Sequence, residues 1–174
     1  FPNSDLLLGP EMKSTGEVYG SDTSADIAYL KARLATEVPV ASAGGAYLTV
    51  RDEDKDGLVS IAEELYGLGF TLYATPGTAD VLRNSNVEVT TVYRINDRRH
   101  PDALDLMRKG EVQFIVNLPT VSGGAVRDGN MMRRLAVEMN IPFVTTLSGA
   151  KMEINAINAL QKKEPEPCKL EVNY

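Results

Sequence analysis

Two threonines flank a Pro-Gly pair in the segment 75–78, which follows a short apolar run and precedes a helical pattern. The hydroxyls of Thr75 and Thr78, the unpaired N–H groups of a helix start and the positive end of its dipole are the parts of an anion site. The same threonines could simply cap the helix, because threonine is a favourable N-cap residue. The sequence leaves both interpretations open.

Four other polar segments also lie at the ends of predicted strands, at 49–55, 93–100, 117–124 and 145–149. In a parallel, doubly wound sheet the C-terminal ends of the strands meet at one edge, where ligands of such folds bind. Together the segments would ring a cleft with hydroxyls, an amide and several cations, which suits a phosphorylated small molecule. The basic segment 93–100 could alternatively be a solvated face.

A competing motif lies at residues 52–63, which fit the twelve-residue EF-hand calcium pattern. Carboxylates stand at its first, third and fifth positions, a glycine at the sixth and Glu63 at the twelfth. An EF-hand needs a helix before the loop, whereas residues 44–51 predict a strand, and the sequence contains no second loop. The alternative is that these acids lie near a helix N-terminus, where the dipole favours them.

Histidine and cysteine are scarce, and this limits the other kinds of site. His100 is the only histidine and Cys168 the only cysteine, which argues against a zinc site and excludes an internal disulfide. A Gly-x-Ser-x-Gly nucleophile elbow is absent. The single cysteine is typical of a reducing compartment, so we expect a cytoplasmic protein.

Composition indicates an ordinary globular domain. The 174 residues are 43% hydrophobic and 24% charged, with a net charge of −6. That charge argues against nonspecific binding to nucleic acid or an anionic membrane, and no apolar run is long enough to span a bilayer. The chain starts at Phe1 and not at methionine, which suggests a piece of a longer protein.

The elements that would position these residues alternate between strands and helices. Strands are predicted at 46–50, 71–74, 87–93, 114–117 and 143–146, and helices at 56–68, 78–84, 101–109, 128–139 and 149–161. This alternation predicts an α/β fold with a doubly wound, five-stranded, mainly parallel sheet covered by helices on both faces.

The chain before this unit has a different character. Residues 25–36 have apolar residues at helical spacing, and 39–45 have the composition of a linker. We therefore divide the chain into a lead-in with one helix (1–38), a linker (39–45), the α/β domain (46–161) and a polar tail (162–174).

Four stretches in this order resemble a known family: LTVRDEDKDGLVSIAEELYGLGF, YATPGTADVL, VYRIND and residues 117–134. They are similar to the methylglyoxal-synthase-like domain that closes the large subunit of carbamoyl-phosphate synthetases, over residues 46–160. The lead-in LLLGPEMKSTGEVYG resembles the end of that enzyme's second ATP-grasp unit. The resemblance therefore assigns residues 1–38 to that unit and 46–161 to a regulatory domain.

The resemblance implies a non-catalytic domain that binds a nucleotide of the UMP or IMP type, ornithine, or both, and so regulates carbamoyl phosphate synthesis for the pyrimidine and arginine pathways. It implies no cofactor or metal here; the parent enzyme uses ATP with Mg or Mn. The partners would be the effector, the rest of the large subunit and its glutaminase subunit, with no nucleic acid or membrane. The implied effector-binding residues are Lys55, Thr75, Gly77, Thr78, Arg94, Asn117, Thr120, Ser122 and Thr145.

The resemblance implies different roles for these effector-binding residues. Lys55 and residues 75–78 would hold the phosphate, Asn117 and Thr120 would lie beside the base or ribose, and Thr145 would lie near the face linked to ornithine. Ser122 is the alternative to Thr120, since the loop is one residue longer than the commonest bacterial form. Arg94 stands where the family often has lysine.

The same fold offers an enzymatic alternative, a methylglyoxal synthase. That activity needs a catalytic carboxylate after the third strand together with a His-Asp pair. Asp97 or Asp102 could act as the base, but residues 126–129 lack the paired histidine.

Overall fold

The computed structural model describes residues 18–118 and 124–162, which form one α/β unit. The strands are β1 (Gly44–Thr49), β2 (Phe70–Ala74), β3 (Thr90–Thr91), β4 (Phe114–Asn117) and β5 (Phe143–Val144). The helices are α1 (Ala25–Leu34), α2 (Lys55–Gly67), α3 (Pro76–Asn84), α4 (Ala103–Arg108), α5 (Gly124–Glu138) and α6 (Leu147–Lys162), with 3₁₀ turns η1 (Asp52–Asp54) and η2 (Ile95–Asp97).

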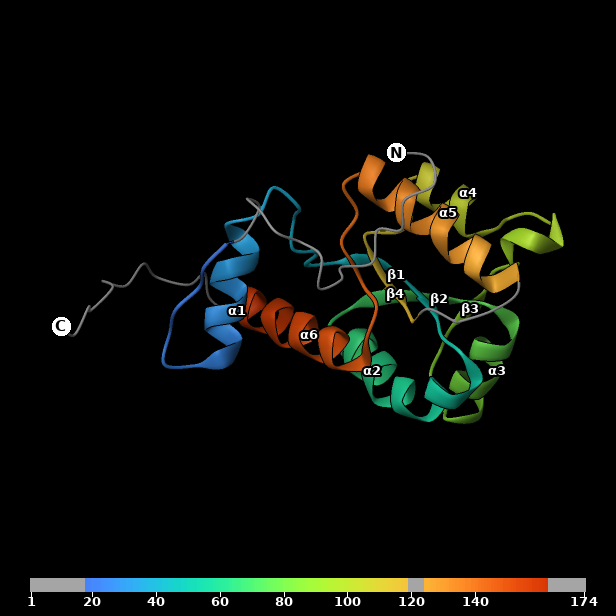
Figure 1. Cartoon of the computed structure of the whole chain (residues 1–174). Coiled ribbons are helices and arrows are strands. Elements are labelled where there is room, and N and C mark those ends of the chain that lie inside the picture. Colours follow the sequence, from blue (N-terminus) through green and yellow to red (C-terminus); the bar gives the residue numbers. More distant parts are fainter. Residues whose placement is uncertain (1–17, 119–123, 163–174) are drawn as a thin grey trace.

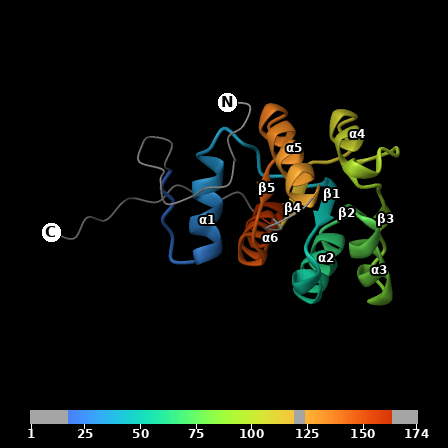
Figure 2. The ribbon, with the colours of Figure 1, turned by 45° about the vertical axis from the view of Figure 1, so that its right-hand side comes forward.

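The five strands form one sheet in the order β3-β2-β1-β4-β5, and all neighbours are parallel. Helices α2, α3 and α6 cover one face of the sheet, while α4 and α5 cover the other (Figure 1, Figure 2). The predicted fold class is confirmed, with a sheet that is wholly parallel.

Two hydrophobic cores, one on each face, follow from alternation along the central strands. Leu48 of β1 points into the core beneath α2, α3 and α6, whereas its neighbour Tyr47 points into the core beneath α4 and α5. Helix α2 contributes Leu58, Ile61 and Leu65 to the first core, at the spacing that places side chains on one helix face.

The edge strands are shorter than predicted. Residues 87–93 were expected to be a strand, but only Thr90–Thr91 form β3. Val87 and Val89 are buried, so the apolar pattern there reflects core packing more than strand pairing. The helix predicted at 101–109 begins at Ala103, because Asp102 caps it: its side chain accepts from the Asp105 N–H at 3.0 Å.

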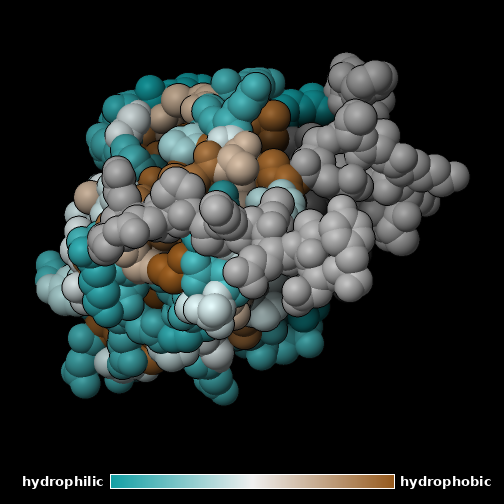
Figure 3. All heavy atoms as spheres, turned by 90° about the vertical axis from the view of Figure 1, so that its left-hand side faces the viewer, coloured by the Kyte–Doolittle hydropathy of each residue, from teal (hydrophilic) through white to brown (hydrophobic). Residues whose placement is uncertain are grey.

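The lead-in helix is part of the same compact unit. Helix α1 packs across α6 (Figure 1), and β1 begins at Gly44, inside the segment predicted to be a linker. The surface seen from the side of α1 is mostly hydrophilic, with apolar areas between (Figure 3). The division into an ATP-grasp end and a regulatory domain stays a prediction. Among the described residues, no helix is both long and apolar enough to cross a membrane.

Candidate functional site

The C-terminal edge of the sheet brings together the loops after β1 and β2. These strands are neighbours, with Leu48 opposite Ala74, so the segments that follow them run side by side. Lys55 is the first residue of α2, and Thr75 is the N-cap of α3. Two helix N-termini therefore begin at the same edge, each with N–H groups that lack a partner within its helix.

Lys55 and Arg94 converge on Gly77 in the first turn of α3. A Cβ atom placed on Gly77 would lie 3.1 Å from Lys55 Nζ and 3.9 Å from Arg94 Nη2. Glycine thus leaves room for an ammonium and a guanidinium group beside a helix N-terminus. This combination of two cations and a positive helix end is suited to an anion, and we call Lys55, Arg94 and residues 75–78 the cradle.

The two threonines of the segment 75–78 complete this cradle. Thr75 Oγ1 donates to Thr78 Oγ1 at 3.2 Å, and the Thr75 side chain makes no capping hydrogen bond. The first turn is closed instead by the Thr75 carbonyl, which accepts from the N–H groups of Thr78 and Ala79. The hydroxyl of Thr75 therefore does not serve as the plain helix cap that its sequence position also allowed.

Lys55 already has an anionic partner at this edge. Its Nζ lies 2.6 Å from Asp52 Oδ1, and the Asp52 side chain is 94% exposed. The hydrogen bond from Lys55, with attraction from Lys55 and Arg94, lowers the pKa of Asp52 below its ordinary value. An ion pair to such an exposed carboxylate contributes little to stability, because water solvates the carboxylate well.

The calcium interpretation of residues 52–63 is wrong. The first three residues form η1, and from Lys55 onward the segment is the continuous helix α2. The glycine expected at the turn of a calcium loop lies within the helix, and Asp52 and Asp54 form ion pairs with Lys55 and Arg51. Because residues 55–63 are helical, the carboxylates cannot wrap around a cation as those of an EF-hand loop do.

Asn117 ends β4 at the same edge, where it pairs with Thr49 of β1. It is buried, and its Oδ1 accepts from Arg133 Nη1 at 2.5 Å. The buried Arg133 of α5, which also donates to Asn130, was not anticipated from the sequence. The one feature of the sequence that could have indicated a buried Arg133 is its position on the apolar side of a helical pattern.

The remaining predicted residues lie partly at this edge and partly outside the described chain. Thr145 follows β5 and is half-buried. The neighbouring Thr146 accepts the Gly149 N–H at 3.0 Å and so closes the first turn of α6. Thr120 and Ser122 fall outside the described residues.

An acidic group lies next to the cations, beside η2. Asp128 Oδ2 accepts from the Asn96 N–H at 3.2 Å, while its buried Oδ1 has no hydrogen-bond partner in the described structure. Burial, together with repulsion from Asp97 and Asp102, raises the pKa of Asp128 above its ordinary value. The site therefore has a basic side and an acidic side, and the sequence interpretation had left Asp128 out.

His100, Asp102 and Asp105 could together offer three metal ligands, since their ligand atoms lie within 4.8 Å of one another in the described chain. Their hydrogen bonds point to another role. Asp102 and Asp105 form the reciprocal cap of α4, and His100 Nδ1 lies 2.5 Å from Asp105 Oδ2. The positive end of a helix disfavours a cation, so we interpret this group as a helix cap.

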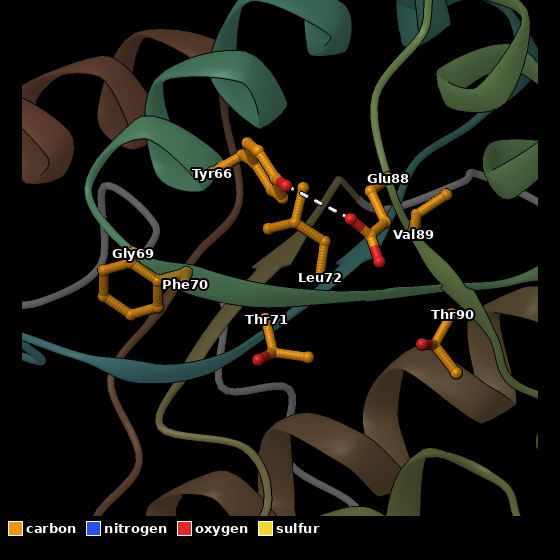
Figure 4. A pocket seen from close by; sticks show the side chains of 8 residues that line it. All are labelled: Tyr66, Gly69, Phe70, Thr71, Leu72, Glu88, Val89 and Thr90. Carbon is orange, nitrogen blue, oxygen red and sulfur yellow. Dashed lines mark hydrogen bonds between the residues drawn. The ribbon is translucent and has the colours of Figure 1, made fainter.

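A pocket of about 470 Å³ lies away from these residues, at the N-terminal end of β2. It opens between residues 69–72 and 88–90, and the Tyr66 hydroxyl donates to Glu88 Oε2 at 3.1 Å across it (Figure 4). No lysine or arginine lines this pocket, so it lacks the charge that a phosphate needs.

Comparison with known proteins identifies relatives. The sequence model of one family, the MGS-like domain, matches residues 57–145, about half of the chain. Along 94% of its length the chain is 43% identical to the carbamoyl phosphate synthase large chain, C-terminal section, of Methanocaldococcus jannaschii and 42% identical to that of Methanopyrus kandleri. It is 39% identical over 92% of its length to the carbamoyl phosphate synthase large chain of Synechocystis.

The chain is much shorter than these relatives, since it spans 26%, 30% and 15% of their respective lengths. Among solved structures, a methylglyoxal synthase from Elizabethkingia anophelis matches with a TM-score of 0.54. That match covers 66% of this chain and 79% of the other at 18% identity, so it supports the fold alone.

Proposed function

Because the chain belongs to the MGS-like domain family and matches carbamoyl phosphate synthase large chains along nearly its whole length, we propose that it is an effector-binding regulatory domain of such an enzyme. The observation that carries the proposal is the convergence of Lys55 and Arg94 on Gly77 at the start of α3. A domain of this kind has no synthetase chemistry of its own.

The ligand we propose is a nucleoside monophosphate of the UMP or IMP type, with ornithine as a further effector. Its phosphate would replace Asp52 as the partner of Lys55 and accept hydrogen bonds from the first turn of α3. Its ribose and base would extend along the strand ends toward Asn117 and Thr145.

Regulation would follow from differential affinity. An effector that binds the active and less active states of the synthetase unequally shifts the balance between them. In this proposal the catalytic parts, with ATP and Mg or Mn, lie in the rest of the large subunit and its glutaminase subunit. The parent would work in the cytoplasm, in the pyrimidine and arginine pathways.

Isothermal calorimetry of the chain against UMP, IMP, ornithine and inorganic phosphate tests the proposal. We expect a nucleotide to bind, and Lys55→Ala with Thr75→Ala to weaken binding at least about tenfold, because hydrogen bonds to charged groups are lost. Lys151→Ala is the matched control, since Lys151 pairs with Glu64 away from the cradle. A double variant that binds normally would refute the proposed phosphate site.

A methylglyoxal synthase activity is the second candidate, favoured by one observation. Asp128 is a half-buried carboxyl with a raised pKa beside Asp97 and Asp102, which suits a general acid or base. The assay is production of methylglyoxal from dihydroxyacetone phosphate, with Asp128→Asn as the control. If the wild-type chain produces methylglyoxal and Asp128→Asn does not, the lyase is established. If the wild-type chain produces none, the regulatory role remains.

A further inference from the structure

One buried carboxylate takes no part in the proposed site. Glu153, in the middle of α6, is 1% exposed. Its carboxylate accepts from Arg33 Nε at 2.9 and 3.2 Å, from Arg33 Nη2 at 3.2 Å and from the Tyr29 hydroxyl at 2.8 Å. Both donors belong to α1, so this buried ion pair joins the lead-in helix to α6.

The Arg33 guanidinium also fixes the chain that follows α1. Its Nη1 donates to Thr36 Oγ1 at 3.1 Å and its Nη2 donates to the Pro39 carbonyl at 3.3 Å. One side chain thus binds the end of α1, the turn after it and α6. A planar guanidinium with several fixed donors is suited to such a junction, whereas a lysine is not.

Three amide side chains form further hydrogen bonds to α1 and to the chain that follows it. Asn155 donates to Asp26 at 2.9 Å, Asn140 donates to the Glu37 carbonyl at 3.1 Å, and Gln161 donates to the Ser42 carbonyl at 2.7 Å. We call residues 25–43 the α1 segment. It is tied at both ends and in its middle to α6 and to the turn after α5, so it is not a free linker.

The other end of α6 lies against the proposed effector site. A Cβ atom on Gly57 would lie 2.5 Å from Leu147 Cδ1, so the first residue of α6 packs directly on the first turn of α2. Lys55 is two residues before Gly57. From Leu147 to Glu153 the helix rises only about 9 Å. One rigid helix therefore connects the Lys55 end of α2 to the buried ion pair.

We propose that α6 couples the occupancy of the strand-end site to the docking of the α1 segment, through the Arg33–Glu153 ion pair. The coupling rests on the proposed effector site. Its two states are a docked and a released α1 segment, and an anion that orders the first turns of α2 and α6 favours the docked state. In the proposed parent this segment joins the domain to the ATP-grasp unit, so its docking is the signal that the catalytic part receives.

Hydrogen exchange of the whole 174-residue chain, with and without saturating UMP or inorganic phosphate, tests this coupling. Without ligand, Glu153→Gln is expected to raise exchange in the α1 segment at least about tenfold while β1 and β4 stay protected. Lys151→Gln, whose exposed pair joins α6 to α2, is the control and is expected to leave the α1 segment unchanged.

With ligand, the wild-type chain is expected to show slower exchange both at residues 145–150 and in the α1 segment. In Glu153→Gln the ligand is expected to slow exchange only at residues 145–150 and not in the α1 segment. Tyr29→Phe, which removes one hydrogen bond to Glu153 and keeps the ion pair, provides a milder variant if Glu153→Gln does not fold.

Two results would overturn the coupling, and they are distinguishable. Protection at residues 145–150 with no change in the α1 segment of the wild type refutes the coupling and leaves the effector site standing. No protection at any position with either ligand refutes both.

Discussion

Two ion pairs of the molecule have cations of similar burial, but the carboxylate is exposed in one pair and buried in the other. Lys55 and Arg33 have side chains that are 18% and 16% exposed, but their partners Asp52 and Glu153 are 94% and 2% exposed. Asp52 forms an ion pair with Lys55 at the ligand edge of the sheet, where Arg94 also attracts it. Glu153 accepts from an arginine and a tyrosine between two helices.

The surroundings of the carboxylate decide what each pair can do. An exposed pair contributes little to stability and exchanges its anion at small cost, because water solvates the released carboxylate. A buried carboxylate without its cation is strongly unfavourable, so that pair stays closed unless the helices separate. The lysine is therefore available to a ligand, whereas the arginine holds two elements together.

The largest expected effect comes from breaking the buried pair. Glu153→Gln is expected to lower the free energy of unfolding by about 3 kcal/mol, because the Arg33 charge loses its counterion in a partly buried position. Lys151→Met removes an exposed pair from the same helix and is expected to cost less than about 1 kcal/mol. Urea denaturation measures both, and equal losses would contradict the contrast between the two pairs.

The exposed pair is expected to respond in the opposite way. Asp52→Asn removes the anion that competes for Lys55, so phosphate affinity is expected to rise about two- to fivefold with little change in stability. Calorimetric titration with inorganic phosphate measures this. A fall in affinity would show instead that Asp52 positions Lys55 for the ligand.

Asp128 provides a carboxyl whose buried Oδ1 has no hydrogen-bond partner in the described structure, although Arg94 attracts it. Its folded pKa is raised, chiefly by burial, so its ionisation opposes folding as pH rises above the ordinary value of 3.8. Asp128→Asn is therefore expected to stabilise the chain at pH 7 and to leave it nearly unchanged at pH 3. Thermal unfolding at both pH values checks this, and a destabilised variant at pH 7 would contradict it.

The smallest effect is expected at the exposed pair of His100 and Asp105. The hydrogen bond to Asp105 raises the pKa of His100 above its ordinary value of 6.5. Its contribution to stability is therefore complete below pH 6.5 and is lost as pH rises through the raised value. Since His100 is the only histidine, its imidazole NMR signals report this pKa directly. In Asp105→Asn the pKa is expected to fall toward 6.5.

Much of the fold could be predicted from the sequence, because period-two and helical patterns record which side chains are buried. The strand pattern at 114–117 and the helix at 56–68 correspond to β4 and α2 within a residue. The calcium pattern at 52–63 failed because most of it lies in that same helix, where the carboxylates cannot wrap around a cation as in an EF-hand loop.

The parts of the site that depend on distant residues could not be predicted in the same way. Arg133 lies 16 residues from Asn117, and Glu153 lies 120 residues from Arg33, so no local spacing links these partners. The sequence placed the segments of Lys55, Gly77 and Arg94 at one edge of the sheet, but only the resemblance to a family selected these three residues as site residues. Their geometry follows from the parallel order of the sheet.

The most direct test of the account is NMR mapping of UMP on the isotopically labelled chain. The account predicts that amide signals of Lys55, Gly77, Thr78 and Arg94 shift on titration and that Lys55→Met abolishes these shifts. Shifts confined to residues 66–72 and 88–90, around the pocket at the N-terminal end of β2 that no lysine or arginine lines, would contradict it.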